Sequence, residues 1–311
     1  MTCMEVWGGN RPVDSGVVMA GLDAWVYSKP YAEAEGGGDV HYVSSCATGR
    51  ITRMMIADVS GHGQSVASVA DELRLMMRRY INYLDQRRFV DEMNTQFAEH
   101  AKVGGFATAV VTTFFAPTND LTISNAGHPP PFVYRASNGQ WSILDDRVAS
   151  DSAELPLGVD GEQHYSQTGE RLKVGDLVLC YTDAFIEARN PQGELLQTRG
   201  LLEVVASIEL GDASTFIERL LTRIRELHGG NLVDDDVTAL LFRPNGLGPN
   251  VPLRDRMLAP LRMIKSAAKS LRRGEPLGLP EVSIPTFGGA LFTPLNRIWS
   301  KRNRRPRLSD R

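Results

Sequence analysis

The sequence predicts an α+β protein in which a largely antiparallel sheet system is covered by helices. Helix-like and strand-like patterns occur in blocks along the chain, and hairpin turns rather than helical crossovers join the strand-like segments in its middle. The chain has 311 residues, 42% of them hydrophobic, which is enough to bury the core of one large domain or of two small ones.

Four amphipathic helices are predicted. Apolar residues recur at the three-to-four spacing of one helical face over 66–84, and a second pattern of this kind covers 89–97. Two further helical patterns, at 201–208 and 216–227, lie towards the end of the body of the chain. We expect these helices to cover the sheets.

Strand-like segments separate the helices. A turn at 117–120 divides the β-branched and aromatic segment 106–127 into a hairpin. Further strands are predicted at "PFVYR" and at "LVLCYT", and the last one at "VTALLFR".

Charge divides the chain into an acidic body and a basic tail. From Asn245 onward there are 14 Lys and Arg against 4 Asp and Glu, a net charge of +10, which leaves 20 against 33, or −13, for residues 1–244. The junction "RPNGLGPNVP" is rich in Pro, Gly and Asn, which predicts a linker. The expected organisation is a lead-in at 1–20, one domain at 21–244, and a linker with a basic tail at 245–311.

The tail contains one helical pattern. The segment "APLRMIKSAAKSLRRG" places apolar residues on one face with Lys and Arg around it, which predicts a short basic amphipathic helix. We therefore expect residues 254–311 to bind an anionic membrane surface, an acidic partner protein or the acidic body itself. The alternative is a mostly disordered, solvated tail. Nucleic acid is the least expected partner, and a homodimer stays open.

Composition also bears on location. No stretch approaches the roughly 18 to 20 consecutive apolar residues of a membrane helix, and the N-terminus lacks the basic start and apolar run of a signal peptide. We therefore expect a cytoplasmic protein that contacts a membrane only through its tail. Cys3, Cys46 and Cys180 are odd in number and have no paired spacing, so they are expected to be reduced thiols.

Acidic residues stand at the ends of three predicted strands. Asp58 closes "RMMIAD", Asp183 closes "LVLCYTD", and Asp235 lies just ahead of "VTALLFR". If the last strand runs antiparallel to the other two, all three carboxylates reach the same rim. Converging acidic oxygens, with Asp39 of "GGGDVHY" as a fourth, suit a hard cation such as Mg²⁺ or Mn²⁺. For any single aspartate, the alternative is a residue that caps a turn.

Six segments of the body carry a family resemblance. They are "GGGD" at 36–39, "ADVSGHG" at 57–63, "NAGHPPP" at 125–131, "LPLGV" at 155–159, "VGDLVLCYTDAFIEARNPQGE" at 174–194 and "DDDVTALLF" at 234–242. Together they resemble the PPM-type (protein phosphatase 2C-like) serine/threonine phosphatases, in particular their stage II sporulation protein E branch. The resemblance implies a four-layer α-β-β-α sandwich with mainly antiparallel sheets and two divalent metals, Mn²⁺ or Mg²⁺, at one end.

The resemblance also implies a set of metal ligands. Asp58 would bridge both metals, and the backbone carbonyl of Val59 would add an oxygen. Asp183 and Asp235 would complete the shell of one metal, and Asp39 would hold the second, partly through water. Asp58, Asp183 and Asp235 would then act in catalysis through a water bound to the metals.

The residues around these ligands have secondary roles. Asp236 is the closest rival of Asp235, since both belong to one run of three aspartates. Gly61 and Gly63 would allow a tight turn and a close approach of the backbone. His62 titrates near neutral pH and is a candidate general acid, although a role at the rim or in the turn is favoured. Ser60 is not expected to be a nucleophile, because no GxSxG elbow surrounds it.

The implied reaction is direct hydrolysis of phosphoserine or phosphothreonine on a signalling protein by metal-activated water, without a phosphoenzyme. In this branch the substrate is commonly an antagonist of an anti-sigma factor in partner-switching signalling. Asp234, Asp236 and Thr238 also spell the DxDxT of haloacid dehalogenase-like phosphatases, but that motif should follow an early strand. The second alternative is a catalytically weak or inactive protein-binding module, because Tyr42 replaces the last aspartate of the GGDFYD common in relatives.

Overall fold

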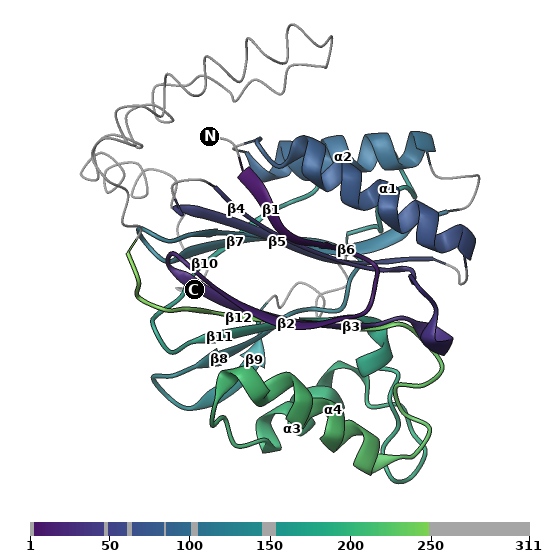
Figure 1. Ribbon diagram of the computed structural model, residues 1–311, viewed down its shortest axis with the longest axis vertical. Coiled ribbons are helices and arrows are strands. Elements are labelled where there is room, and N and C mark those ends of the chain that lie inside the picture. The colour runs from purple at the N-terminus through teal and green to yellow at the C-terminus, as the bar shows by residue number, and fades with distance from the viewer. Residues whose placement is uncertain are drawn as a thin grey trace, which may run out of the picture. The chain divides into compact units, whose positions relative to one another are not determined.

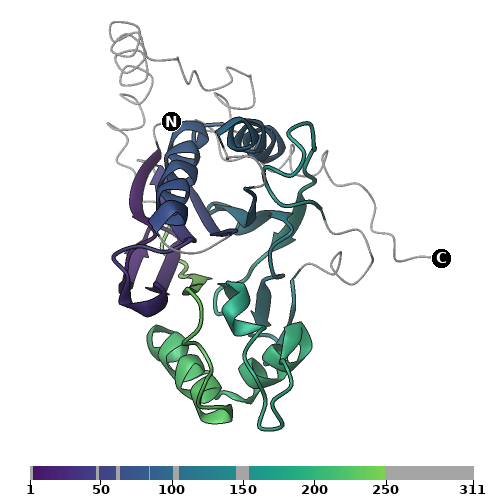
Figure 2. The ribbon, with the colours of Figure 1, turned by 90° about the vertical axis from the view of Figure 1, so that its right-hand side faces the viewer.

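The computed structural model describes residues 3–46, 49–60, 64–83, 85–100, 105–144 and 154–248. All of them except Asn82 and Tyr83 belong to one compact unit. In that unit two six-stranded antiparallel sheets face each other, with α1 and α2 on the outer face of one sheet and α3 and α4 on the outer face of the other (Figure 1). Figure 2 shows the same four layers from the side, with the two helix pairs on opposite sides of the sheets. The predicted α-β-β-α sandwich is therefore confirmed.

The first sheet, sheet A, has the strand order β1-β4-β5-β6-β7-β10. Its strands are β1 (Cys3–Gly9), β4 (Asp39–Cys46), β5 (Ile51–Val59), β6 (Ala107–Phe115), β7 (Asp120–Ala126) and β10 (Thr168–Arg171). It is covered by α1 (Gln64–Tyr80) and α2 (Gln86–His100).

The second sheet, sheet B, has the strand order β2-β3-β12-β11-β8-β9. Its strands are β2 (Val13–Met19), β3 (Leu22–Lys29), β12 (Val237–Pro244), β11 (Leu177–Tyr181), β8 (Phe132–Arg135) and β9 (Gln140–Ile143). It is covered by α3 (Gln197–Ser207) and α4 (Phe216–Leu227), and short 3-10 turns occur at Tyr31–Glu33, Asp183–Phe185 and Ala213–Thr215.

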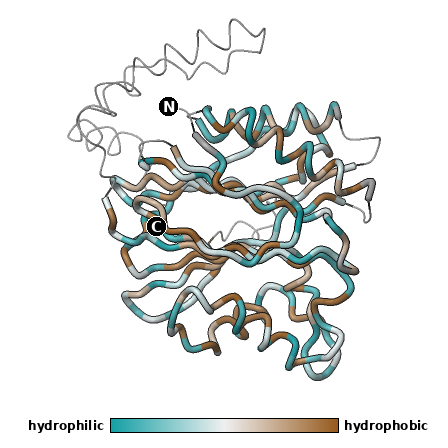
Figure 3. The backbone as a smooth tube through the Cα atoms, viewed as in Figure 1, coloured by the Kyte–Doolittle hydropathy of each residue, from teal (hydrophilic) through white to brown (hydrophobic). Residues whose placement is uncertain are grey.

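Two apolar cores hold sheet B in place. Val43 and Ile56 of sheet A meet Leu240 of β12 in the core between the sheets. The next residue, Leu241, faces the other core together with Ile224 of α4, because side chains alternate along a strand. β12 is thus buried on both faces, which explains why its sequence is a nearly continuous apolar run. In Figure 3 hydrophobic and hydrophilic colours alternate along both the strands and the helices.

The predicted helices and central strands are confirmed, but residues 1–20 are more than a lead-in. They contribute β1 to the edge of sheet A and β2 to the edge of sheet B. Cys46 and Cys180 are free thiols, as expected. Among the described helices, none is long and apolar enough to cross a membrane. The predictions for residues 61–63, and those for the tail from 249 onward, lie outside the described residues.

Candidate functional site

Four acidic residues lie at one end of the sandwich. β4 begins at Asp39, and its antiparallel pairing with β5 places Asp39 directly opposite Asp58. In sheet B, β11 ends at Tyr181, two residues before Asp183, and β12 starts two residues after Asp235. Because β11 and β12 are antiparallel, the end of one and the start of the other lie at the same edge. We call this set of Asp39, Asp58, Asp183 and Asp235 the acidic rim.

Asp39 is the buried member of the acidic rim. Its residue is only 3% exposed, and the hydroxyl of Thr182 donates a hydrogen bond to its Oδ2 at 2.9 Å, which joins sheet B to sheet A. Thr238 also hydrogen-bonds to the carboxylate. Burial raises the pKa of Asp39 well above its usual value and the charge of Asp58 raises it further, while the two threonines offset this only in part.

Asp58 and Asp183 are also crowded by like charges. Burial, followed by the charges of Asp183 and Asp235, raises the pKa of Asp58 to about 7. Burial and then the Glu187 carboxylate raise the pKa of Asp183. Carboxylates this close repel one another when both are ionised. The acidic rim therefore has a surplus of negative charge that a bound cation would neutralise.

The donor set of the acidic rim fits a hard divalent cation. Carboxylate oxygens and a backbone carbonyl such as that of Val59 are the ligands that Mg²⁺ and Mn²⁺ prefer. As the side chains lie, however, no three Asp, Glu, His or Cys groups of the described ranges converge closely enough to hold an ion. Asp183 is half-exposed and Asp235 is exposed, so both carboxylates are accessible to a cation from solvent.

Asp236 holds the glycine-rich loop that precedes the rim. Its carboxylate accepts the backbone N–H of Tyr31 at 2.6 Å and that of Gly38 at 2.5 Å. A Cβ at Gly37 would clash with both carboxylate oxygens, so this close approach needs glycine. Asp235, in contrast, is exposed and its Oδ1 accepts the backbone N–H of Asp236. The two candidate ligands of the aspartate run thus have different surroundings.

His128 and Ser60 support the local backbone. Nδ1 of His128 lies 2.8 Å from the Thr108 hydroxyl, and Asn125 bonds both the N–H and the carbonyl of His128 at 2.8 and 2.9 Å. Burial lowers the pKa of His128 to about 3, so its ring is neutral near pH 7. The Ser60 hydroxyl accepts the backbone N–H of Phe106 at 3.0 Å, which is a contact that shapes the turn.

Several residues that contact the rim or the loop before it were not predicted from the sequence to have a role in the site. These are Asn10, Thr182 and Glu187, together with Thr238, which was noted only as a motif position. Thr182 and Glu187 flank Asp183 closely in the chain, and this proximity was a usable signal. Asn10 stands 29 positions before Asp39 in an unremarked turn, and no local pattern connects the two.

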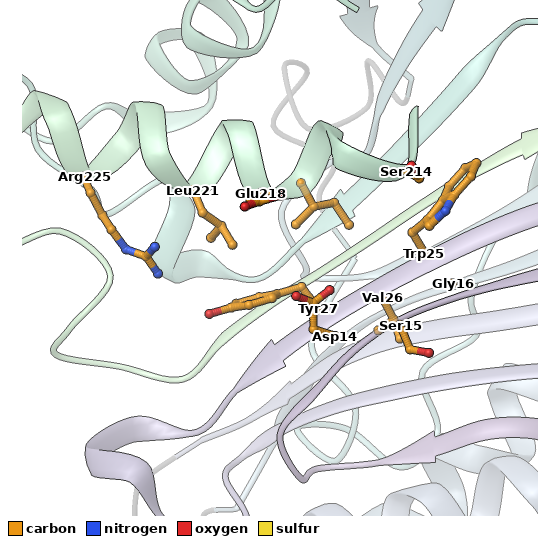
Figure 4. A pocket seen from close by; sticks show the side chains of 11 residues that line it. Asp14, Ser15, Gly16, Trp25, Val26, Tyr27, Ser214, Glu218, Leu221 and Arg225 are labelled. Atoms are coloured by element: carbon orange, nitrogen blue, oxygen red, sulfur yellow. The ribbon is translucent and has the colours of Figure 1, made fainter. Parts of the chain in front are cut away.

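A separate cavity of about 350 Å³ lies on the outer face of sheet B, beside α4 (Figure 4). Trp25 and Tyr27 of β3 line it together with Asp14 of β2 and with Glu218 and Arg225 of α4. None of the rim carboxylates lines this cavity. The acidic rim is therefore an edge of the sandwich and not part of that hollow.

Comparison with known proteins defines the class of this molecule. Residues 48–245, well over half of the chain, match the family model of stage II sporulation protein E (SpoIIE). The chain therefore belongs to the SpoIIE family. The predicted resemblance is confirmed at this level.

Individual relatives are similar at low sequence identity. The chain is 22% identical over 223 residues to the phosphoserine phosphatase RsbU of Bacillus subtilis, which covers 71% of this chain and only 63% of that relative. Among solved structures, the RsbU and RsbW domains of Rv1364c from Mycobacterium tuberculosis align with a TM-score of 0.59 at 21% identity, over 84% of this chain and 70% of that one. The PP2C phosphatase domain of SpoIIE with a fragment of its regulatory domain, from Bacillus subtilis, aligns with a TM-score of 0.60 at 16% identity, over 73% and 64% of the two chains. These structural similarities establish a PP2C-like fold.

Proposed function

We propose that this protein is a metal-dependent phosphoprotein phosphatase that hydrolyses phosphoserine or phosphothreonine on a signalling protein. The acidic rim carries this proposal, because four carboxylates from two sheets gather at one end, and burial together with neighbouring carboxylates raises the pKa values of Asp39, Asp58 and Asp183. Membership of the SpoIIE family and the similarity to a phosphoserine phosphatase support the same reaction. The substrate we propose is a phosphorylated antagonist of an anti-sigma factor.

In this proposal the acidic rim holds two divalent cations, Mn²⁺ or Mg²⁺. The crystal structure of RsbX was determined in complex with magnesium. It aligns with this chain with a TM-score of 0.53 at 14% identity, over 75% of this chain and all of RsbX. The carboxylates of Asp39, Asp58, Asp183 and Asp235, with the Val59 carbonyl, would hold these cations. When bound, the cations lower the pKa of water and neutralise the phosphoryl oxygens.

The chain's own residues have positioning roles in this site. Thr182 and Thr238 fix the buried Asp39 carboxylate from sheet B, and Asp236 fixes the backbone of Gly38 next to it. A substrate phosphate approaching the uncompensated carboxylates would be repelled. Phosphate binding therefore depends on the cations.

The test is hydrolysis of p-nitrophenyl phosphate by the purified chain with Mn²⁺, with Mg²⁺ and with chelator. We expect metal-dependent turnover that Asp58→Asn and Asp183→Asn each lower by at least about 100-fold, because each removes a charged ligand. Asp234→Asn is the matched control, since Asp234 is an exposed member of the same aspartate run, and it should leave turnover unchanged.

A wild-type chain without activity would contradict the proposed phosphatase. Absence of both turnover and metal binding in the wild-type chain would reject the phosphatase and favour a protein-binding module that keeps the fold. Among the described residues, no three acidic groups converge on one ion position. This arrangement is the observation that favours testing the binding module against the phosphatase.

A further inference from the structure

The glycine-rich loop before Asp39 is fixed almost entirely through its backbone. Gly37 and Gly38 have no side chains, so their own conformational preferences hold the loop only weakly. All four of their polar backbone groups nevertheless have partners. Gly38 donates to Asp236 at 2.5 Å and accepts the N–H of Val59 at 3.2 Å, and both groups of Gly37 bond to Asn10.

Asn10 belongs to the connection between β1 and β2, far from the loop in the chain. Its backbone carbonyl accepts the N–H of Gly37 at 3.0 Å, and its side-chain Nδ2 donates to the Gly37 carbonyl at 3.1 Å. The same Nδ2 donates to the carbonyl of Ala67 in α1 at 2.9 Å. Asn10 is only 4% exposed, and a Cβ at Gly36 would lie 3.2 Å from its amide atoms. The amide is therefore enclosed as well as bonded.

The chemistry of this position suits asparagine. One amide nitrogen carries two N–H donors, and here both are directed to carbonyls, one in the loop and one in the helix that follows the Asp58 turn. An aspartate of the same shape would offer only acceptor oxygens to these carbonyls, and would repel both. Alanine would leave both carbonyls without their donor, which costs free energy when the site is buried.

We infer that Asn10 is a positioning residue of the metal site, because it sets the place of the Gly37–Gly38 backbone and thereby the approach of Asp39 to Asp58. This inference rests on the proposed function. Asn10 lies outside the residues 48–245 that match the family. Asp183 and Asp235 are attached to β11 and β12 of sheet B, so the influence of Asn10 should be greatest on the cation that Asp39 holds.

The test measures metal binding directly. Mn²⁺ is titrated into the full chain, with binding followed by isothermal calorimetry and free Mn²⁺ by electron paramagnetic resonance. For Asn10→Asp we expect the Kd of one of the two sites to rise at least tenfold and that of the other to rise by a smaller factor, since outer partners of ligands typically influence affinity by 10- to 100-fold. The Mn²⁺ concentration that gives half-maximal turnover of p-nitrophenyl phosphate should rise together with the weakened Kd.

Glu5→Gln is the matched control. Glu5 of β1 forms an ion pair with Arg74 of α1, so this variant weakens the attachment of β1 to the same helix without touching the loop. Its two Kd values should equal those of the wild type, and thermal melting in chelator checks that each variant is folded. If Asn10→Asp does not fold, Asn10→Ala, which removes both donors without adding a charge, takes its place.

The outcomes separate the two proposals. If the folded Asn10 variant binds Mn²⁺ at both sites with wild-type affinity, Asn10 has no positioning role. The role is also rejected if Asn10→Asp and Glu5→Gln weaken Mn²⁺ binding at both sites by the same factor. A wild-type chain that binds no Mn²⁺ would instead overturn the metal site, and the proposed function with it.

Discussion

Asp235 and Asp236 are neighbours in the chain, yet their carboxylates have different partners. Asp236 accepts backbone N–H groups of Tyr31 and Gly38, so its charge is already used in holding the loop. The charges of both residues raise the pKa of Asp58, but Asp235 is exposed at the rim. We therefore propose that Asp235 binds the metal and that Asp236 holds the loop.

This assignment predicts a separation between stability and metal affinity. Asp236→Asn should destabilise the metal-free fold by about 1–3 kcal/mol, because an amide cannot accept all the N–H groups that the carboxylate accepts. Asp235→Asn should leave that stability within about 0.5 kcal/mol but weaken Mn²⁺ binding at least about tenfold. Urea denaturation in chelator and Mn²⁺ titration measure the two effects, with Asp234→Asn as the common control. The assignment is wrong if the two variants exchange these phenotypes.

Within the aspartate run, the family resemblance favoured Asp235 as the ligand and left Asp236 as its closest rival, because the two adjacent residues lie just ahead of the same strand. The choice depends on the loop that ends at Gly38, about 200 positions earlier in the chain, and only the folded arrangement brings it against Asp236. Asn10 was missed for the same reason, since its partners are distant in sequence and contribute only backbone groups.

At the scale of the element, β12 joins the apolar core to the acidic rim. It pairs with β3 on one side and with β11 on the other, which makes it a central strand of sheet B. Thr238, its second residue, is fully buried. Its hydroxyl lies 2.9 Å from that of Ser28 in β3 and also hydrogen-bonds to Asp39 across the sandwich.

A pair of threonine-to-valine variants tests this bridging role. Thr238→Val keeps the shape of the side chain but leaves Ser28 and the buried Asp39 short of a partner, so we expect a loss of about 1–3 kcal/mol in the free energy of unfolding. Thr112 of β6 is equally buried, but its hydroxyl has no hydrogen-bond partner among the described residues. Thr112→Val should therefore be neutral or stabilising. Equal losses in both variants, measured by urea denaturation, would assign the effect to packing alone.

Elements were predictable from the sequence where burial imposes a clear pattern. α1 and α4 carry long apolar faces, β11 is a continuous apolar run and β12 is a nearly continuous one. β2 was missed because most of it is exposed at the edge of sheet B, so its side chains need not alternate between polar and apolar. β1 contains a register shift between Glu5 and Trp7, which breaks the period of two on which strand prediction depends.

At the scale of the whole molecule, folding concentrates charge that the unfolded chain keeps apart. Residues 1–244 carry a net charge of −13, and the two sheets bring four carboxylates of that excess to one end of the sandwich. Burial and the neighbouring carboxylates disfavour the ionised forms of Asp39, Asp58 and Asp183, and their pKa values are therefore raised. The stability of the metal-free molecule should therefore depend on pH in a direction that can be worked out.

A carboxyl group whose pKa is raised by folding binds protons more tightly in the folded state, so its stabilising contribution is present at low pH and is lost as the pH rises. For Asp58 the loss extends from its ordinary pKa, near 4, to about 7. Buried His41 and His128 oppose it, because their pKa values are lowered to about 4 and about 3. Their stabilisation grows with rising pH but is complete near the ordinary histidine pKa of about 6.5. Between about pH 6.5 and pH 8, the decline due to Asp58 therefore remains.

We accordingly predict that the melting temperature in chelator falls between pH 6.5 and pH 8 by about 2 °C or more. Mn²⁺ binds the ionised carboxylates in competition with protons, so saturating Mn²⁺ should raise the melting temperature more at pH 8 than at pH 6.5. Asp58→Asn is neutral at every pH and should reduce both effects, while Asp39 and Asp183 continue to titrate, whereas Asp234→Asn should keep both effects. Differential scanning calorimetry across this range measures all three proteins. A flat profile in chelator would contradict the raised pKa of Asp58, and a metal increment independent of pH would mean that Mn²⁺ binds elsewhere than at the acidic rim.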